Sequence, residues 1–205
     1  ISEYVPQVRT WFYYMHVLAV IMFNKPAFKN VVVTGTVLAE DGSKMSKSKG
    51  NFPNPHLIFD KYGADALRFY LMSSPLMRAE DLNFSEKGVQ EVYRKVVALL
   101  YNIYQFYEMY CSDNKIFNKP AKKSILDQWI LSVTNKTIRD VTNALDEYDT
   151  IKACSAIVSC IEDLSLWYVR RSRERFSSDE KKDAMPTLAY ALMTLAKLIA
   201  PISPF

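Results

Sequence analysis

The feature that most constrains the fold is a change in hydrophobic periodicity near Ser85. Before it, residues 31–34 form a β-branched run, Val-Val-Val-Thr, which is typical of a buried strand. After it, apolar residues recur at helical spacing, which predicts amphipathic helices. The first of these helices carries Val89, Val92, Val96, Leu99, Ile103 and Phe106. We therefore expect an α/β region over residues 1–84, followed by an all-α helical bundle over residues 85–205.

The α/β region is expected to alternate helix and strand. Residues 7–24 predict a helix whose apolar face is continuous enough to be buried. The strand at 31–34 should be followed by a second short extended piece, and a helix before a buried strand is half of an α/β repeat, so we expect a parallel sheet. Residues 51–74 predict two helices that are interrupted at Gly63, with Asn54 as the N-cap of the first.

The second region is expected to contain long helices joined by polar turns. Ser85 and Ser124 each begin one, and Thr150 is expected to cap another. The last should run over residues 184–199, with Pro186 near its start, where a missing N–H costs little.

Composition limits the compartment more than the function. The 205 residues carry a net charge of +4 and three cysteines without metal-ligand spacing or an even number for disulfides. A reducing, cytoplasmic location is the simplest interpretation. We find no secretory signal and no apolar run long enough to span a membrane. The chain lacks an initial Met and ends on an apolar, Pro-rich phrase, so we expect it to belong to a longer protein.

The segment AEDGSKMSKSKGN, residues 39–51, is the strongest functional candidate, and we call it the lysine loop. Lys44 and Lys47 are compact charges on flexible stems, suited to meeting phosphate oxygens. A cation held where negative charge develops stabilises the transition state of nucleotidyl transfer. Met45 can hold the loop down, and the glycines allow it to close over a nucleotide. By composition alone, a solvated basic loop is the favoured interpretation, and a nuclear-import signal is a weaker one because the basic run is short and interrupted.

The context of this loop resembles the class I aminoacyl-tRNA synthetases. KMSKS, preceded by LAEDG and followed by KGN, is similar to the second signature of that family. YGADALRFYL resembles the segment after that signature in the branched-chain subgroup. LDQWILSVTN, LDEYDTIKA and DLSLWYVRRSRERF resemble the start of the anticodon-binding domain, the last being most like the isoleucine-specific member. The resemblance covers nearly the whole chain in order and implies the C-terminal part of a Rossmann-type catalytic domain before a helical bundle.

The resemblance implies an isoleucine-tRNA ligase that joins isoleucine to ATP, with Mg²⁺, and then transfers the aminoacyl group to tRNA(Ile). Lys44 and Lys47 would be catalytic and contact the ATP phosphates, Lys47 being the stronger candidate for the transition state. Met45, Ser46 and Ser48 would complete the ATP-binding loop. No metal site is expected within this chain.

The first residues match another family phrase less closely. Glu3 and Gln7 fall where the family has an acidic residue and a glutamine near the aminoacyl-adenylate. The chain departs from the family at Tyr4, Pro6 and Thr10, so Glu3 and Gln7 could instead be ordinary polar residues before a helix.

Two parts of the family's machinery do not occur in the sequence. The His-Ile-Gly-His-type signature is absent, and the only histidines, His16 and His56, are expected to be structural. An editing domain, the second hydrolytic site of such enzymes, is absent as well. We therefore expect this chain alone to be inactive, because half of the ATP pocket is missing.

WYVRRSRERF places four arginines near the end of one helix. Helical spacing groups Arg171 and Arg175 with the buried Leu164 and Tyr168, so Arg171 should continue the buried face. Arg170 and Arg173 should face outward, where the resemblance implies contact with tRNA phosphates. A salt-bridged helix end, with Asp163 and Glu174 as partners, is the alternative.

Tyrosines recur along the helix that follows Ser85. Base stacking is conceivable for such residues, but at helical spacing we expect core and inter-helix packing. The residues are Tyr93, Tyr101, Tyr104, Tyr107 and Tyr110.

Other functions stay open at this point. The chain could belong to a valyl- or leucyl-tRNA synthetase, because the amino acid pocket lies mostly outside it. It could also be a non-enzymatic tRNA-binding module, although the intact KMSKS residues disfavour a decayed one. A His-Ile-Gly-His-type segment upstream in the gene would distinguish an enzyme from such a module.

Overall fold

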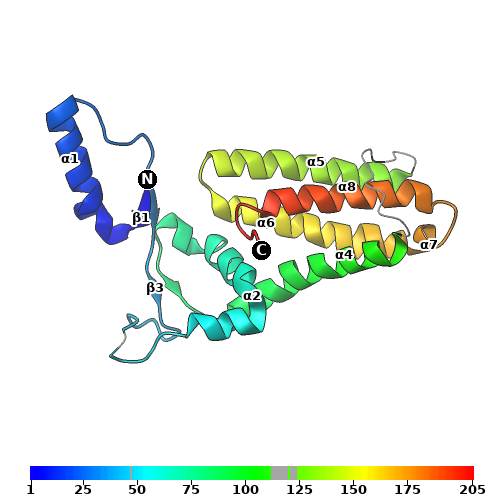
Figure 1. The fold of residues 1–205 in the computed structure, drawn as a ribbon, viewed down its shortest axis with the longest axis horizontal. Helices are drawn as coiled ribbons and strands as arrows, with labels where there is room; N and C mark the ends of the chain where they lie inside the picture. The colour runs from blue at the N-terminus through cyan, green and yellow to red at the C-terminus, as the bar shows by residue number, and fades with distance from the viewer. Residues whose placement is uncertain (47, 112–119, 121–123) are drawn as a thin grey trace.

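The computed structural model describes residues 1–46, 48–111, 120 and 124–205. Its elements form a helical bundle at one end and a slender α/β region at the other (Figure 1). In chain order, the elements before the bundle are β1 (Ser2–Tyr4), the 3₁₀ turn η1 (Val5–Arg9), α1 (Trp11–Phe23), β2 (Val32–Thr34), β3 (Val37–Leu38), α2 (Pro55–Met72), the 3₁₀ turn η2 (Pro75–Arg78) and β4 (Leu82–Asn83).

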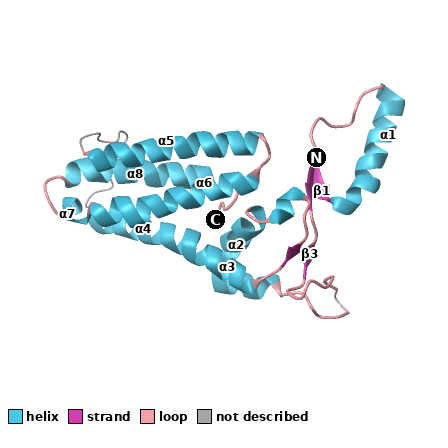
Figure 2. Cartoon of the chain, turned by 180° about the vertical axis from the view of Figure 1, so that it is seen from behind, coloured by secondary structure: helices cyan, strands magenta, loops and turns pink. Residues whose placement is uncertain are grey.

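The remaining elements are helical. They are α3 (Glu86–Val92), the π-helical η3 (Tyr93–Val97), α4 (Ala98–Tyr110), α5 (Ile125–Asp146), α6 (Thr150–Glu162), the π-helical η4 (Asp163–Val169), α7 (Arg173–Phe176) and α8 (Lys181–Ile199). Here the bundle means α4, α5, α6, η4 and α8, which lie side by side (Figures 1 and 2). The predicted α/β region followed by helices is confirmed.

Two short parallel pairs make up the sheet structure. β1 pairs with β2, with Ser2 opposite Val32, and β3 pairs with β4, with Val37 opposite Leu82. Gly35 connects β2 to β3 where the chain meets the Glu80 backbone: a Cβ there would lie 1.8 Å from the Glu80 carbonyl oxygen. Only glycine fits so close an approach. The predicted strand, second extended piece and parallel pairing are confirmed.

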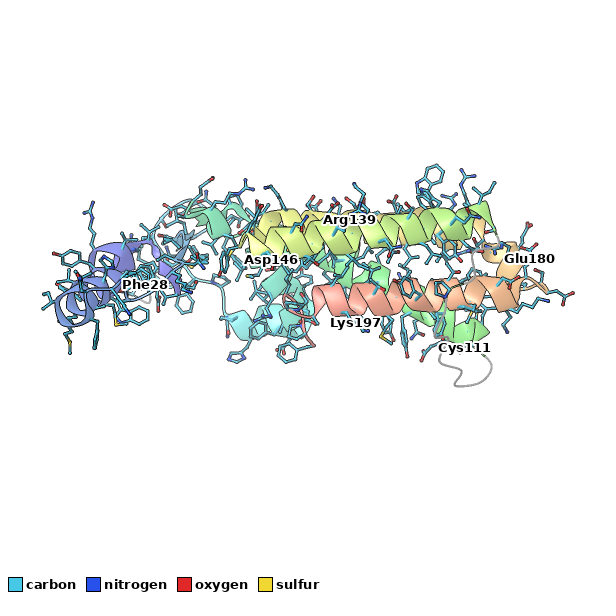
Figure 3. All side chains as sticks on the ribbon, turned by 90° about the horizontal axis from the view of Figure 1, so that it is seen from above. Phe28, Cys111, Arg139, Asp146, Glu180 and Lys197 are labelled. Carbon is cyan, nitrogen blue, oxygen red and sulfur yellow. The ribbon has the colours of Figure 1, made fainter. Side chains whose placement is uncertain are left out.

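Helix α1 differs from the sequence-based prediction. It begins at Trp11 rather than near residue 7, and of its side chains only Phe12 is buried. Apolar side chains such as Leu18 and Ile21 are 56% and 75% exposed. The expectation of a buried helix was wrong because, within the described residues, its packing partners are few: Phe12 and His16 meet Phe28 (Figure 3).

Several helix starts follow the local rules, and others do not. Asn54, Ser85 and Ser124 cap their helices through their side chains, and Ser124 forms a capping box with Asp127. The expected pair of helices after residue 51 is confirmed: α2 consists of two helical parts that meet at a kink at Gly63, where φ is +79°.

Two expected boundaries in the bundle were wrong. Asp149, not Thr150, caps α6 by accepting from the Lys152 N–H at 3.0 Å. Thr150 instead donates to the Met72 carbonyl at 2.8 Å, so a contact with α2 replaces the cap. Helix α8 begins at Lys181, which places Pro186 inside the helix rather than near its start.

The bundle has its own apolar core. Most of its buried side chains come from α5, α6, η4 and α8. The others are Phe69 of α2, Val96 of η3, Ile103 of α4, Phe176 of α7 and Ile202. Fully buried side chains include Ile130, Ile157, Leu164, Tyr168, Leu188 and Leu195. Cys154 and Cys160 are buried thiols, and burial raises the pKa of Cys154 to about 12. None of the helices formed by the described residues combines the length and apolar character that crossing a bilayer requires.

Polar contacts connect the bundle to α2 and its neighbours. Arg68 of α2 donates to the Ile202 carbonyl at 2.8 Å, and Ser203 donates to the Asp65 carbonyl at 3.1 Å. Arg78 pairs with Asp149 at 3.2 Å. These contacts hold α2 against the bundle, and α2 in turn supports the lysine loop.

Candidate functional site

The lysine loop leaves the carboxyl end of β3, a strand paired in parallel with β4 (Figure 2). In open sheets of this kind, ligands bind outside the carboxyl ends of the strands. An isolated antiparallel bridge joins Leu38 to Lys44, so the chain turns back on itself directly after β3. The Ala39 N–H bonds to the Ser43 carbonyl at 2.9 Å and closes that turn. The first lysine therefore lies at the edge where the fold favours a ligand.

One side chain connects both halves of the loop. The Asn51 amide oxygen accepts from the Ser46 N–H at 2.8 Å. Its nitrogen donates to the Ser43 hydroxyl at 3.0 Å and to the Lys44 carbonyl at 3.2 Å. Sequence reasoning did not single out Asn51. The signal available was an amide directly after Gly50, where short polar side chains often bond to nearby backbone.

An apolar contact also holds the loop, and two glycines in the left-handed region of backbone space allow its tight path. Met45 is half-buried and packs on the cluster of Ile58, Ala66, Phe84 and Val89, as its predicted anchoring role requires. Gly42 and Gly50 have φ values of +79° and +61°, a region that other residues rarely adopt. These backbone conformations allow the chain to turn tightly beyond the end of β3.

Charge in the loop is arranged so that Lys44 is available to a ligand. Its side chain is exposed, and within the described part of the chain no carboxylate forms an ion pair with it. The nearby Asp41 is engaged by Ser43, and hydrogen bonds from Ser43 lower the pKa of the Asp41 carboxyl below its usual value. Ser46 and Ser48 share a hydroxyl–hydroxyl bond of 2.9 Å. Lys47 lies outside the described residues.

Glu3 and Gln7 lie on consecutive elements, not in one cluster. Glu3 is exposed on β1, opposite Val33 of β2. The Gln7 amide oxygen accepts from the Thr10 hydroxyl at 2.5 Å and from the Trp11 N–H at 3.3 Å. In this structure Gln7 therefore serves the start of α1, which is the ordinary structural role considered for it.

The arginine-rich helix contains a register shift that the sequence did not reveal. Residues 163–169 form the π-helical segment η4, which adds a residue to a turn and rotates everything that follows. As a result Ser172 is buried where Arg171 was expected. Arg171 is exposed, with its guanidinium 4.5 Å from the centre of the Trp167 ring. The expectation of a buried Arg171 was therefore wrong.

Arg175 remains on the inner side and closes a buried network. Its guanidinium forms two bonds with Asp127, of 3.0 and 2.8 Å, and Tyr168 donates to the same carboxylate at 2.8 Å. Burial raises the pKa of Asp127, but the bonds from Arg175, Tyr168 and Ser124 outweigh burial and hold the pKa below its usual value. This network joins α5, η4 and α7 and has a structural role.

Arg170 and Arg173 face solvent, as the sequence analysis expects. In the portion of the chain that the structure describes, Asp163 and Glu174 form no ion pair with them. The alternative of a salt-bridged helix end thus loses its expected partners, while Arg175 pairs with Asp127 and Glu180 instead. Two cationic side chains remain available on one surface of the bundle.

The tyrosines and histidines mostly pack. Tyr93, Tyr107 and Tyr110 lie against the two apolar clusters, as expected. Tyr101 and Tyr104 are 59% and 44% exposed, so the packing prediction was wrong for these two. His16 lies against Phe28 and His56 against Phe59, at ring separations of 6.0 and 6.1 Å.

Comparison with known proteins places this geometry in a family. Residues 1–84 match the family model for class I tRNA synthetases of the I, L, M and V type. Residues 127–205 match the model for the anticodon-binding domain of tRNA ligases. Among solved structures, the LeuRS of Agrobacterium radiobacter K84, in a complex with tRNA and LeuAMS, aligns with a TM-score of 0.69 at 23% identity. That alignment covers 94% of this chain and 24% of the LeuRS chain.

A methionyl-tRNA synthetase of Mycobacterium tuberculosis, in complex with methionyl-adenylate, aligns with a TM-score of 0.68 at 22% identity. It covers 85% of this chain and 36% of that one. At such identities the two structures show a shared fold.

Sequence relatives are more similar. Isoleucine–tRNA ligases of Protochlamydia amoebophila and Treponema pallidum are each 41% identical, and that of Chlamydia trachomatis is 44% identical, over 100% of this chain. The chain spans about a fifth of the length of these curated relatives, 20% to 21%. The match runs from the strands, through the lysine loop, to the end of α8. Along its whole length the chain is therefore a homologue of isoleucine–tRNA ligases, and its two parts match the class I tRNA synthetase and anticodon-binding family models.

Proposed function

We propose that this chain is the part of an isoleucine–tRNA ligase that contacts the phosphates of ATP and begins the tRNA-binding bundle. The observation that carries the proposal is the placement of Lys44, an exposed and unpaired cation within the described residues, just beyond the carboxyl end of β3. Identity of 41% to 44% with isoleucine–tRNA ligases along the entire chain supports isoleucine as the amino acid.

In the proposed reaction, the carboxylate of isoleucine attacks the α-phosphorus of ATP, and pyrophosphate leaves with the bonding electron pair. Negative charge grows on the phosphate oxygens as the bond forms, so a cation held there lowers the barrier. Lys44 and Lys47 supply that charge, and Ser46 and Ser48 offer hydroxyl donors beside them. Mg²⁺ would arrive with the ATP phosphates as part of the substrate and neutralise further charge.

Glu3 and Gln7 are proposed to lie near the aminoacyl-adenylate. Glu3 supports this role through its exposure on β1, which leaves its carboxylate available. The Gln7 side-chain amide oxygen accepts hydrogen bonds from the Thr10 hydroxyl and the Trp11 N–H. The proposed contribution of Gln7 is therefore to fix the start of α1 beside the adenylate.

The bundle is proposed to bind tRNA(Ile) through phosphates, with Arg170 and Arg173 as contacts. Their exposure and lack of carboxylate partners among the described residues support this role. We also propose a domain division, with residues 1–84 in the catalytic domain and 85–205 in the tRNA-binding part, and a cytoplasmic location. Because the chain spans about a fifth of its relatives, we expect it to be inactive alone.

An ATP–pyrophosphate exchange assay on the full-length protein tests the proposal, with isoleucine, valine and leucine supplied in turn. We expect exchange with isoleucine, and a fall of roughly 10²–10³-fold in its rate in Lys47→Met, the size expected when one charge-stabilising group is lost. Lys44→Met should also slow the reaction. Lys61→Met is the matched control, because Lys61 lies on α2 and pairs with Glu86. A rate unchanged in both loop variants would refute the catalytic role, and faster exchange with valine or leucine would refute the assigned amino acid.

A further inference from the structure

The Asn51 side chain forms a connection inside the lysine loop that directs three hydrogen bonds toward one segment. Three contacts reach Ser43, Lys44 and Ser46, at 3.0, 3.2 and 2.8 Å. A neutral amide offers one acceptor oxygen and two donor hydrogens in one plane. Here the oxygen meets an N–H, and the nitrogen meets a carbonyl and a hydroxyl. The orientation of the amide is therefore determined by its partners, because a flipped amide would place its NH₂ group against the Ser46 N–H and its oxygen against the Lys44 carbonyl.

The contacts lie on both sides of the lysine. The Lys44 carbonyl accepts a hydrogen bond from the Asn51 amide. On one side of Lys44, the Ser43 hydroxyl also accepts from Asn51, and on the other side Met45 packs on the apolar cluster. The turn that follows is closed by Ser46, whose carbonyl accepts from the Gly50 N–H at 3.2 Å. Asn51 is the group that joins this turn to the segment that carries Lys44.

Asn51 is itself connected to the rigid part of the fold over a short distance. Pro53 and Pro55 restrict the backbone between it and α2, and Asn54 caps that helix by accepting from the His56 N–H at 3.0 Å. The position of α2 is in turn set by contacts with the bundle, including Arg68 with Ile202. Asn51 therefore lies at the end of the loop that is nearest to α2.

We propose that Asn51 is a positioning residue for adenylate formation, holding residues 43–46 so that the Lys44 ammonium meets the developing phosphate charge in one geometry. This inference rests on the proposed function of the loop. Asn51 acts through Lys44 and does not contact the substrate. Its loss frees the backbone on both sides of Lys44, and small misplacements of a charge-stabilising group are costly in rate.

The test uses the full-length protein that contains this chain. In ATP–pyrophosphate exchange, Asn51→Ala should lower kcat by about 10- to 100-fold while leaving the KM for isoleucine unchanged, because the interaction matters in the transition state. Asn54→Ala is the matched control: it removes an amide of the same size, three positions away, that caps α2 without touching the loop. It should lower the melting temperature and leave kcat per active site unchanged.

A double-mutant cycle gives a readout that a merely structural role would not move. Ser43→Ala removes one of the three partners, so we expect a loss of a few-fold in kcat on its own and no further loss in the Asn51→Ala background. Losses that simply multiply would overturn the inference, as would a normal kcat in Asn51→Ala or equal kcat losses in Asn51→Ala and Asn54→Ala. Normal exchange in both Lys44→Met and Lys47→Met would instead refute the proposed function itself. A slow Lys44→Met beside a normal Asn51→Ala would refute the positioning role alone.

Discussion

The bundle and the N-terminal region differ in how completely they bury their apolar side chains. In the bundle, helices α5, α6 and α8 carry fully buried residues along their inner faces, and α8 alone buries Leu188, Ala191 and Leu195. In α1, a helix of thirteen residues, only Phe12 is buried. Since apolar burial is the dominant stabilising term, the bundle should hold its structure more firmly than the region that carries the lysine loop.

The difference also separates two kinds of charged group. Asp127 is fully buried and pairs with Arg175, whose side chain is only 13% exposed, whereas Lys44, Arg170 and Arg173 are exposed. Paired, buried charge specifies the arrangement of helices, and exposed charge is available to a ligand. The following predictions are ordered from the largest expected effect to the smallest.

Breaking the buried pair should have the largest effect on the bundle. Asp127→Ala leaves the Arg175 guanidinium without its main partner and removes half of the capping box of α5, so we expect a loss of about 3–5 kcal/mol in the free energy of unfolding. Asp140→Ala is the control, since it removes an exposed pair with Lys136 at 3.7 Å and should cost less than about 0.5 kcal/mol. Urea denaturation of the 205-residue chain measures both, and equal losses would contradict the structural role of the network.

The same substitution in both regions tests the comparison directly. Leu188→Ala on α8 should cost about 2–5 kcal/mol, because Leu188 is fully buried in the bundle core. Leu18→Ala on α1, where the side chain is 56% exposed, should change stability by no more than about 0.5 kcal/mol. The measurement is again urea denaturation of the chain. A large loss at Leu18 would mean that α1 is covered in solution.

The loss of folding stability at low pH should come more from the bundle than from the lysine loop. The folded-state pKa of Asp127 lies below the ordinary value of 3.8, so the unfolded chain takes up a proton first as the pH falls. The stabilisation is therefore complete well above pH 4 and is lost as the pH falls through 3.8 and then through the folded-state pKa. Asp127→Asn should make the free energy of unfolding depend less on pH in that range. Asp41→Asn, at an exposed carboxylate whose pKa is also lowered, should change the profile less.

The smallest effect concerns the exposed arginines of the bundle. Replacing Arg170 and Arg173 with Ala in the full-length protein should weaken tRNA binding and reduce the slope of log affinity against log salt by about one per lost phosphate contact. Arg94→Ala with Arg139→Ala removes the same charge from η3 and α5 and serves as the control. Filter binding at several salt concentrations measures the slope. An equal change in both double variants would show that only net charge matters.

Much of the fold followed from local patterns. Caps at Asn54, Ser85 and Ser124 and the β-branched run at 31–34 gave the main element boundaries, because capping and strand preference depend on neighbouring residues. The lysine loop was recognisable because its residues are contiguous. Exposure of α1 was not predictable, since burial depends on what lies opposite a helix rather than on its own composition.

The sequence by itself determined which residues the lysine loop contains and where α2, α3 and α5 begin. Tertiary structure decided how those residues are used. Asn51 became the junction of the loop only because the chain turns back after β3, and Asp127 met Arg175 across 48 positions only because the helices pack. The π-helical turn η4 exchanged Arg171 for Ser172 on the buried side. Local sequence sets short-range hydrogen bonds and periodicity, whereas contacts between distant residues depend on the packing of whole elements.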